Sequence, residues 1–87
     1  MDYIELERSS IYALQQFGSI TFNGEKITIP PEDTLADRMV SLDRSKDLNV
    51  RYADEGIATY IILHTTKEGK KIIANFDTYH SILKYSI

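Results

Sequence analysis

Apolar and polar side chains alternate most regularly over residues 57–76 of the 87-residue chain. Two runs rich in Ile, Thr and Tyr flank a short polar segment, and this pattern is typical of a β-hairpin. With a two-residue turn at Glu68-Gly69, Leu63 would lie opposite Ala74, and one apolar set would share a face. This set consists of Ile57, Ile61, Leu63, Ile72, Ala74 and Phe76. We predict that the hairpin forms the centre of the fold.

The opposite face of this hairpin, which we call the second face, is more apolar than a solvated strand surface usually is. It carries Tyr60, Ile62, His64, Ile73 and Asn75. Helices in α+β proteins usually gather on one side of the sheet, which would leave an open apolar patch typical of a partner or homodimer interface. Helices divided between the faces would bury it instead. We favour the open face and predict that Tyr60, Ile62, His64 and Ile73 contact a partner.

Helical periodicity is strongest near the N-terminus, where it predicts a helix over residues 2–16 that ends at Gly18. Its inner stripe would consist of Ile4, Ile11 and Leu14. A tight hairpin should follow over residues 19–29, because Asn23-Gly24 favours a turn with two positive φ angles. One side of this hairpin is polar, so we expect it near the edge of the sheet.

The second predicted helix covers residues 32–46, directly after Pro30-Pro31. Its apolar side would consist of Leu35, Met39 and Leu42. The other side, which includes Asp37, carries mixed charge. We name Asp37 and Asp43 of this segment as further candidate partner contacts.

The rest of the chain adds a short strand at residues 48–52, a turn at residues 54–56 and a last helix capped by Asn75 or Asp77. We therefore predict an α+β protein with the element order α-β-β-α-β-β-β-α. Two hairpins would build a mostly antiparallel sheet of about four to five strands, accompanied by three helices.

Composition fits one small folded domain spanning residues 1–87. Apolar residues make up 43% of the chain and charged residues 26%, which excludes intrinsic disorder. The chain has no cysteine, so disulfides and thiolate metal sites are excluded. No apolar run approaches the roughly 20 residues that cross a bilayer, and the acidic N-terminus is unlike a signal peptide. We expect a cytoplasmic protein without a membrane partner.

Candidate catalytic and ligand-binding residues form no known motif. His64 and His80 lack the spacing that converges on a metal, and Ser41 lacks a G-x-S-x-G nucleophile elbow. The glycines are isolated, so they form no phosphate-cradling loop, and the carboxylates are too scattered for an EF-hand. We predict no enzymatic activity, no cofactor, no metal and no small-molecule substrate.

Six tyrosines in so short a chain favour a protein interface, because tyrosine joins a large apolar body to a polar tip. We therefore expect a small regulator or inhibitor that binds another protein or a second copy of itself. Small acidic α+β chains of this length are common among phage and mobile-element products and bacterial regulators.

Two alternatives stay open. The first is a nucleic-acid-binding protein that uses Lys67, Lys70 and Lys71 at the tip of the long hairpin, together with Arg38, Arg44 and Arg51. The net charge of −3 argues against phosphate contacts. The second is an acidic mimic of nucleic acid that blocks a nucleic-acid-binding enzyme through carboxylates such as Asp37 and Asp43. Arginines interspersed among these carboxylates weaken the mimicry.

Overall fold

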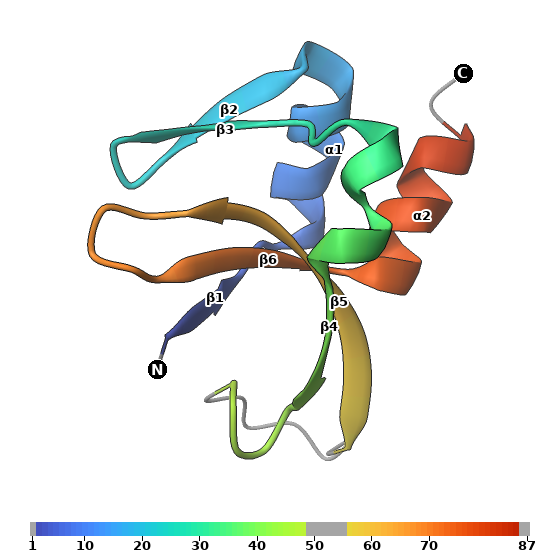
Figure 1. The fold of residues 1–87 in the computed structure, drawn as a ribbon. Coiled ribbons are helices and arrows are strands. Elements are labelled where there is room, and N and C mark those ends of the chain that lie inside the picture. The colour runs from blue at the N-terminus through green and yellow to red at the C-terminus, as the bar shows by residue number, and fades with distance from the viewer. Residues whose placement is uncertain (1, 49–55, 86–87) are drawn as a thin grey trace.

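One strand precedes the first α-helix, five strands separate it from the second, and the second α-helix ends the described chain (Figure 1). The structure, a computed structural model, describes residues 2–48 and 56–85, apart from the side chains of residues 82–85. The elements in chain order are β1 (Tyr3–Glu5), α1 (Arg8–Phe17), β2 (Ser19–Phe22), β3 (Glu25–Thr28), β4 (Met39–Asp43), β5 (Ile57–Thr65), β6 (Lys71–Asn75) and α2 (Phe76–Tyr85). The predicted α+β class is confirmed, whereas the described residues hold two α-helices and not three.

Two separate sheets contain the strands. The larger has the order β1-β6-β5-β4, in which β1 runs parallel to β6 and the other neighbours are antiparallel. β2 and β3 form the smaller sheet, with the predicted turn: φ is 49° at Asn23 and 82° at Gly24. The expected place of this hairpin at the edge of the main sheet is wrong. Its buried Ile27 packs onto the core of the main sheet, so the hairpin forms a layer of its own.

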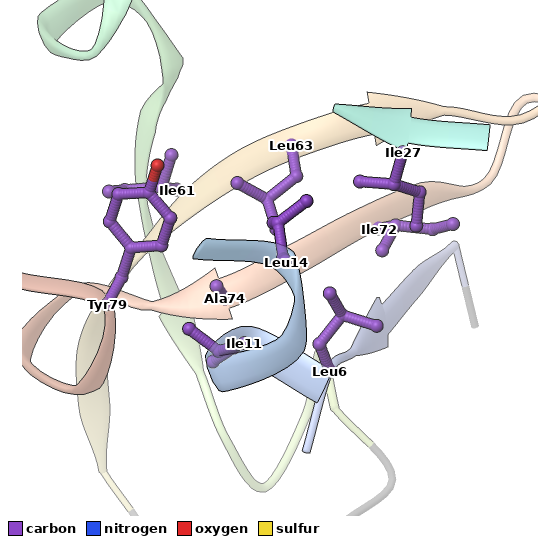
Figure 2. Close-up of a cluster of buried hydrophobic side chains, with 9 residues drawn as sticks. All are labelled: Leu6, Ile11, Leu14, Ile27, Ile61, Leu63, Ile72, Ala74 and Tyr79. Atoms are coloured by element: carbon purple, nitrogen blue, oxygen red, sulfur yellow. The ribbon is translucent and has the colours of Figure 1, made fainter. Parts of the chain in front are cut away.

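Both α-helices and the small sheet cover one face of the main sheet, which we call the helix face (Figure 1). The side chains buried there form one cluster (Figure 2): Leu6, Ile11, Leu14, Ile27, Ile61, Leu63, Ile72, Ala74 and Tyr79. Four of these come from the apolar set predicted for the long hairpin. Ile57 was predicted to join them but is 78% exposed, because β5 begins away from both α-helices (Figure 1).

The turn between β5 and β6 contains one residue more than the predicted two-residue turn. Thr66 N–H donates to the Lys70 carbonyl at 2.7 Å, and Gly69 has a positive φ of 87°. This is the geometry of a three-residue hairpin loop with glycine in the left-handed conformation. As a result Thr65 lies opposite Lys71, one residue away from the predicted pairing.

A β-bulge between Ile62 and His64 shifts the pairing by one more residue, so Ile61 lies opposite Ala74 where Leu63 was expected. Because a shift of one residue reverses a face and a shift of two restores it, Ile61 and Leu63 keep their predicted place on the helix face. His64, beyond the bulge, does not keep its predicted place. It lies on the helix face, where its ring contacts the small sheet.

The first predicted helix is wrong at its start. Residues 3–5 form β1, and Leu6 N–H extends this pairing by donating to the Ile73 carbonyl at 2.8 Å. α1 begins only at Arg8 and ends as predicted at Gly18, whose φ is 82°. Pairing with β6 therefore outweighs the local helical pattern, as tertiary contacts commonly outweigh propensity.

Residues 32–46 do not form the second predicted helix. Two short 3-10 helices, Glu32–Thr34 and Ala36–Arg38, lead into β4. In β4, Val40 and Leu42 pack together on the second face of the sheet. Val40 and Leu42 are two residues apart, which is the spacing of a strand. The same segment also fits helical spacing, and pairing with β5 favours the strand over the helix.

The C-terminal prediction is confirmed where the structure describes it. Asn75 Oδ1 accepts the Thr78 N–H at 3.1 Å and so caps the first turn of α2. The predicted strand at residues 48–52 and turn at residues 54–56 lie largely outside the described residues. None of the helices in the described ranges is long and apolar enough to cross a membrane.

Candidate interaction site

The second face of the main sheet is closed where the sequence predicted an open patch. Tyr60 and Ile73 are fully buried there. Around them pack Leu42 and Leu48, with partly buried Tyr3, Val40, Ala58 and Ile62. The helices do gather on the helix face, as expected, but side chains from β1, β4 and the turn after β4 cover the second face in their place. The prediction that Tyr60 and Ile73 are exposed was therefore wrong, and Ile62 is partly buried.

The remaining predicted contact residues do not lie together. Asp37 is exposed in the second 3-10 helix, Asp43 ends β4, and His64 is on the helix face. Asp43 Oδ1 accepts bonds from the Ser45 hydroxyl at 2.7 Å and the Ser45 N–H at 3.0 Å, and these lower the pKa of the Asp43 carboxyl. Because residues 32–46 do not form the second predicted helix, Asp37 and Asp43 do not lie on one helical face.

The basic residues considered for nucleic-acid binding are also dispersed. Lys67 and Lys70 are exposed at the β5–β6 turn, whereas Lys71 Nζ lies over the ring of Tyr3, 5.8 Å from its centroid. The Arg38 side chain contacts β5, because its Nη1 donates a hydrogen bond to the Ile62 carbonyl oxygen at 3.3 Å. These cations do not outline one continuous groove.

A polar group on the second face was not foreseen from the sequence. Burial raises the pKa of the Glu5 carboxyl, and the positive charge of Arg44 opposes this only in part. Burial also raises the pKa of the Tyr60 hydroxyl, and the negative charge of Glu5 adds to that effect. Glu5 was not identified from the sequence because it falls within the helix predicted over residues 2–16.

Glu5→Gln is expected to make the protein more stable than wild type at neutral pH. A folded-state pKa above the unfolded value means that this group stabilises the fold at low pH, below the unfolded pKa, and that the contribution is lost as pH rises through the folded pKa. Gln cannot ionise, so the cost at neutral pH disappears. The measurement is the urea midpoint at pH 7 and at a pH below the ordinary value of 4.5.

The matched control is Glu7→Gln, which removes the same charge from an exposed position two residues along the chain. It should change the midpoint little at either pH, because surface substitutions usually change stability by about 0.5 kcal/mol or less. A Glu5→Gln variant that is less stable than wild type at neutral pH would show that the ionised carboxylate is held by favourable contacts.

A cleft of about 390 Å³ opens between the tips of the two hairpins. Its walls come from β1, β6 and both hairpin turns: Ile4, Phe22, Asn23, Glu25, Thr66, Glu68, Lys70 and Ile72. Ile4 and Ile72 lie side by side across the β1–β6 pair and supply an apolar floor. Glu68 and Lys70 are exposed at the rim with opposite charges.

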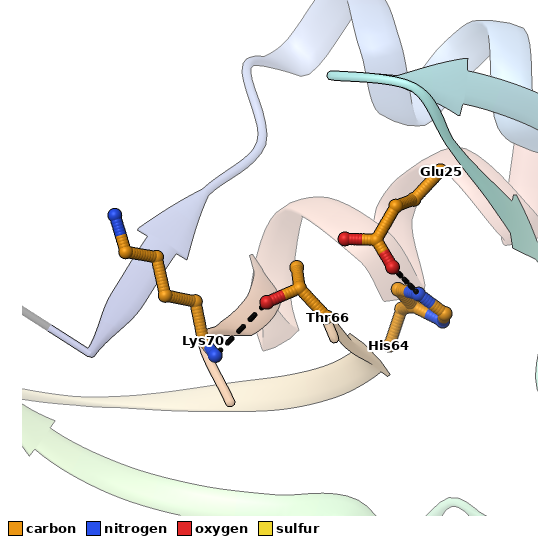
Figure 3. Close-up of polar contacts among 4 residues, drawn as sticks. All are labelled: Glu25, His64, Thr66 and Lys70. Atoms are coloured by element: carbon orange, nitrogen blue, oxygen red, sulfur yellow. Dashed lines mark hydrogen bonds and ion pairs between the residues drawn. The ribbon is translucent and has the colours of Figure 1, made fainter. Parts of the chain in front are cut away.

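A contact between an imidazole and a carboxylate joins the two hairpins beside the cleft (Figure 3). His64 Nε2 of β5 lies 3.1 Å from Glu25 Oε1 of β3, with the two side chains 31% and 19% exposed. On the other wall, Thr66 Oγ1 accepts the Lys70 N–H at 3.0 Å and so fixes the β5–β6 turn (Figure 3). Within the described ranges, no group of three carboxylate, imidazole or thiol side chains could hold a metal ion.

This cleft and the contact beside it could not be predicted from the sequence, because they need two features of the tertiary structure. One is β1, which places Ile4 beside Ile72. The other is the bulge, which turns His64 toward Glu25. A signal for β1 was present, since Tyr3, Ile4 and Glu5 also fit the polar–apolar alternation of a strand.

Comparison with known proteins adds nothing to this geometry: no family model, no curated protein and no solved structure matches the chain. The function must therefore be argued from the site.

Proposed function

We propose that this protein is a small, non-catalytic regulator or inhibitor that binds another protein, holding a short segment of it in the cleft between the hairpins. The observation that carries the proposal is the composition of the cleft. Partly exposed Ile4 and Phe22 lie beside exposed Glu68 and Lys70. An apolar centre within a polar rim is the usual anatomy of a protein interface.

The way in which the polar groups of the cleft are engaged supports a binding role. The Thr66 hydroxyl already accepts a bond from its own turn, and His64 contacts Glu25. Neither arrangement prepares a nucleophile next to a base, as covalent catalysis requires. A space of about 390 Å³ also fits a few side chains of a partner. The proposal keeps the cytoplasmic location expected from the sequence.

Selection from a random linear peptide library displayed on phage tests this function. We expect enriched peptides whose affinity falls about tenfold or more in Ile4→Trp, because the larger ring occupies the cleft. The matched control is Ile57→Trp, the same substitution at a strand position that is 78% exposed and outside the cleft. It should bind the peptides as wild type does.

Two results would contradict the proposal. One is a selection that enriches no peptide. The other is a set of enriched peptides that bind Ile4→Trp and wild type equally well, since these peptides would occupy another surface. Circular dichroism of both variants shows whether the fold is retained.

A further inference from the structure

A free strand edge borders the cleft. β1 is the end strand of the main sheet, and within the described chain it pairs only with β6. The Asp2 carbonyl accepts the Lys71 N–H at 2.7 Å, which fixes the residues of β1 that face β6. Backbone groups of successive residues point to opposite sides of a strand. The N–H and C=O groups of Tyr3 and Glu5 therefore point away from the sheet.

The other edge strand of the sheet, β4, is capped at its C-terminal end. There, Asp43 N–H donates to Asp47 Oδ2 at 2.8 Å, and the Asp43 carbonyl accepts the Asp47 N–H at 2.7 Å. These bonds use the outward backbone groups at the end of β4, and such a cap hinders the addition of a strand. Of the two edges, β1 is the one that offers backbone groups beside an apolar cleft.

We propose that β1 pairs with an extended segment of the partner in which basic and apolar residues alternate. This inference rests on the proposed function and specifies the partner for the same site. An added strand would hydrogen-bond to the outward groups of Tyr3 and Glu5, as in recognition by strand addition. Its side chains would alternate between the two faces of the sheet.

The apolar residues of the segment are required by the helix face. Ile4 lines the cleft, and a residue directly opposite it on an added strand would have its Cβ about 4.5–5.5 Å away. That residue would enter the cleft between Ile4 and the tip of the small sheet, where Phe22 also contributes apolar surface. A β-branched side chain fits this position because it packs well on a pleated surface.

Acidic groups on and near the second face favour basic residues in the added segment. Glu5 is half-buried there, and burial raises the pKa of its carboxyl although the positive charge of Arg44 opposes this effect. A lysine or arginine opposite Glu5 would supply the missing positive charge. Asp2 and Glu7, both exposed near β1, favour the same sign of partner. They also disfavour a second copy of the chain, because two β1 strands would bring like charges together.

The test uses a short peptide of alternating lysine and valine, blocked at both ends, and measures amide hydrogen exchange by NMR. In the free protein the Tyr3 and Glu5 amides should exchange rapidly. With peptide they should slow by about tenfold or more, because they gain hydrogen-bond acceptors. The control peptides are an alternating glutamate–valine peptide and a lysine–valine peptide that is N-methylated at alternate residues. Both should bind weakly, and Glu5→Gln should weaken binding of the lysine–valine peptide.

Four results would overturn this inference: no binding of the lysine–valine peptide, equal binding of either control peptide, exchange at Tyr3 and Glu5 that does not change, or protection of these amides by self-association without peptide. In each case, library peptides that still lose affinity in Ile4→Trp would leave the proposed function standing. Loss of those peptides as well would reject both.

Discussion

Tyr60→Asp is expected to unfold the protein. Tyr60 is fully buried at the centre of the second face, so the substitution would remove a large aromatic side chain and place a carboxylate in the space. A buried charge without a partner is among the most destabilising changes known. The new carboxylate would also lie near Glu5, whose negative charge acts on Tyr60 more strongly than the opposing positive charge of Arg44. The expected loss exceeds about 4 kcal/mol, close to the entire stability of many small domains.

Far-UV circular dichroism and a thermal melt measure the result, with Tyr60→Phe as the control. Phe keeps the ring and loses only the hydroxyl, whose net hydrogen bonding is typically worth about 1 kcal/mol, so this variant should remain folded. A Tyr60→Asp variant that melts cooperatively near the wild-type temperature would mean that the second face is open, as the sequence alone predicted.

The parts of the fold that the sequence predicts are those determined locally. Asn23-Gly24 defines its own turn because few residues adopt two positive φ angles in succession. Gly18 and Asn75 likewise mark helix ends through their own conformation and side-chain bonds. In the long hairpin, periodicity correctly assigned Ile61, Leu63, Ile72 and Ala74 to the helix face but wrongly included the exposed Ile57. It could not locate the bulge near His64, because a bulge depends on the partner strand.

Two segments were mispredicted because their apolar residues fit both the helical period of 3.6 residues and the strand period of two residues. Residues 3–5 and 39–43 both allow a helical or a strand reading, and in each case an available sheet edge decides in favour of the strand. These two strands are also what changes the candidate site. β4 helps to close the second face, and β1 creates both the floor of the cleft and the free edge beside it. A site built by long-range pairing leaves no motif in the sequence.

The position of the bulge also explains why Tyr60 and His64 lie in such different surroundings. Both were predicted on the second face, at even-numbered positions of one strand. Tyr60 lies before the bulge and is fully buried on that face, whereas His64 lies after it and contacts Glu25 of the small sheet. The bulge therefore lets one strand contribute to the second-face core and to a contact with the small sheet beside the cleft.

Leu63→Ala is expected to lower the free energy of unfolding by about 2–5 kcal/mol, because it empties a packed position in the helix-face core. Leu63 is 5% exposed and lies at the bulge, among side chains from both α-helices and the small sheet (Figure 2). Urea unfolding followed by circular dichroism gives the value. The control is Ile57→Ala, which alters a residue that the sequence assigned to the same face but which is 78% exposed; it should cost about 0.5 kcal/mol or less. Equal losses for the two variants would contradict the packing described here, because they would place both side chains in similar surroundings.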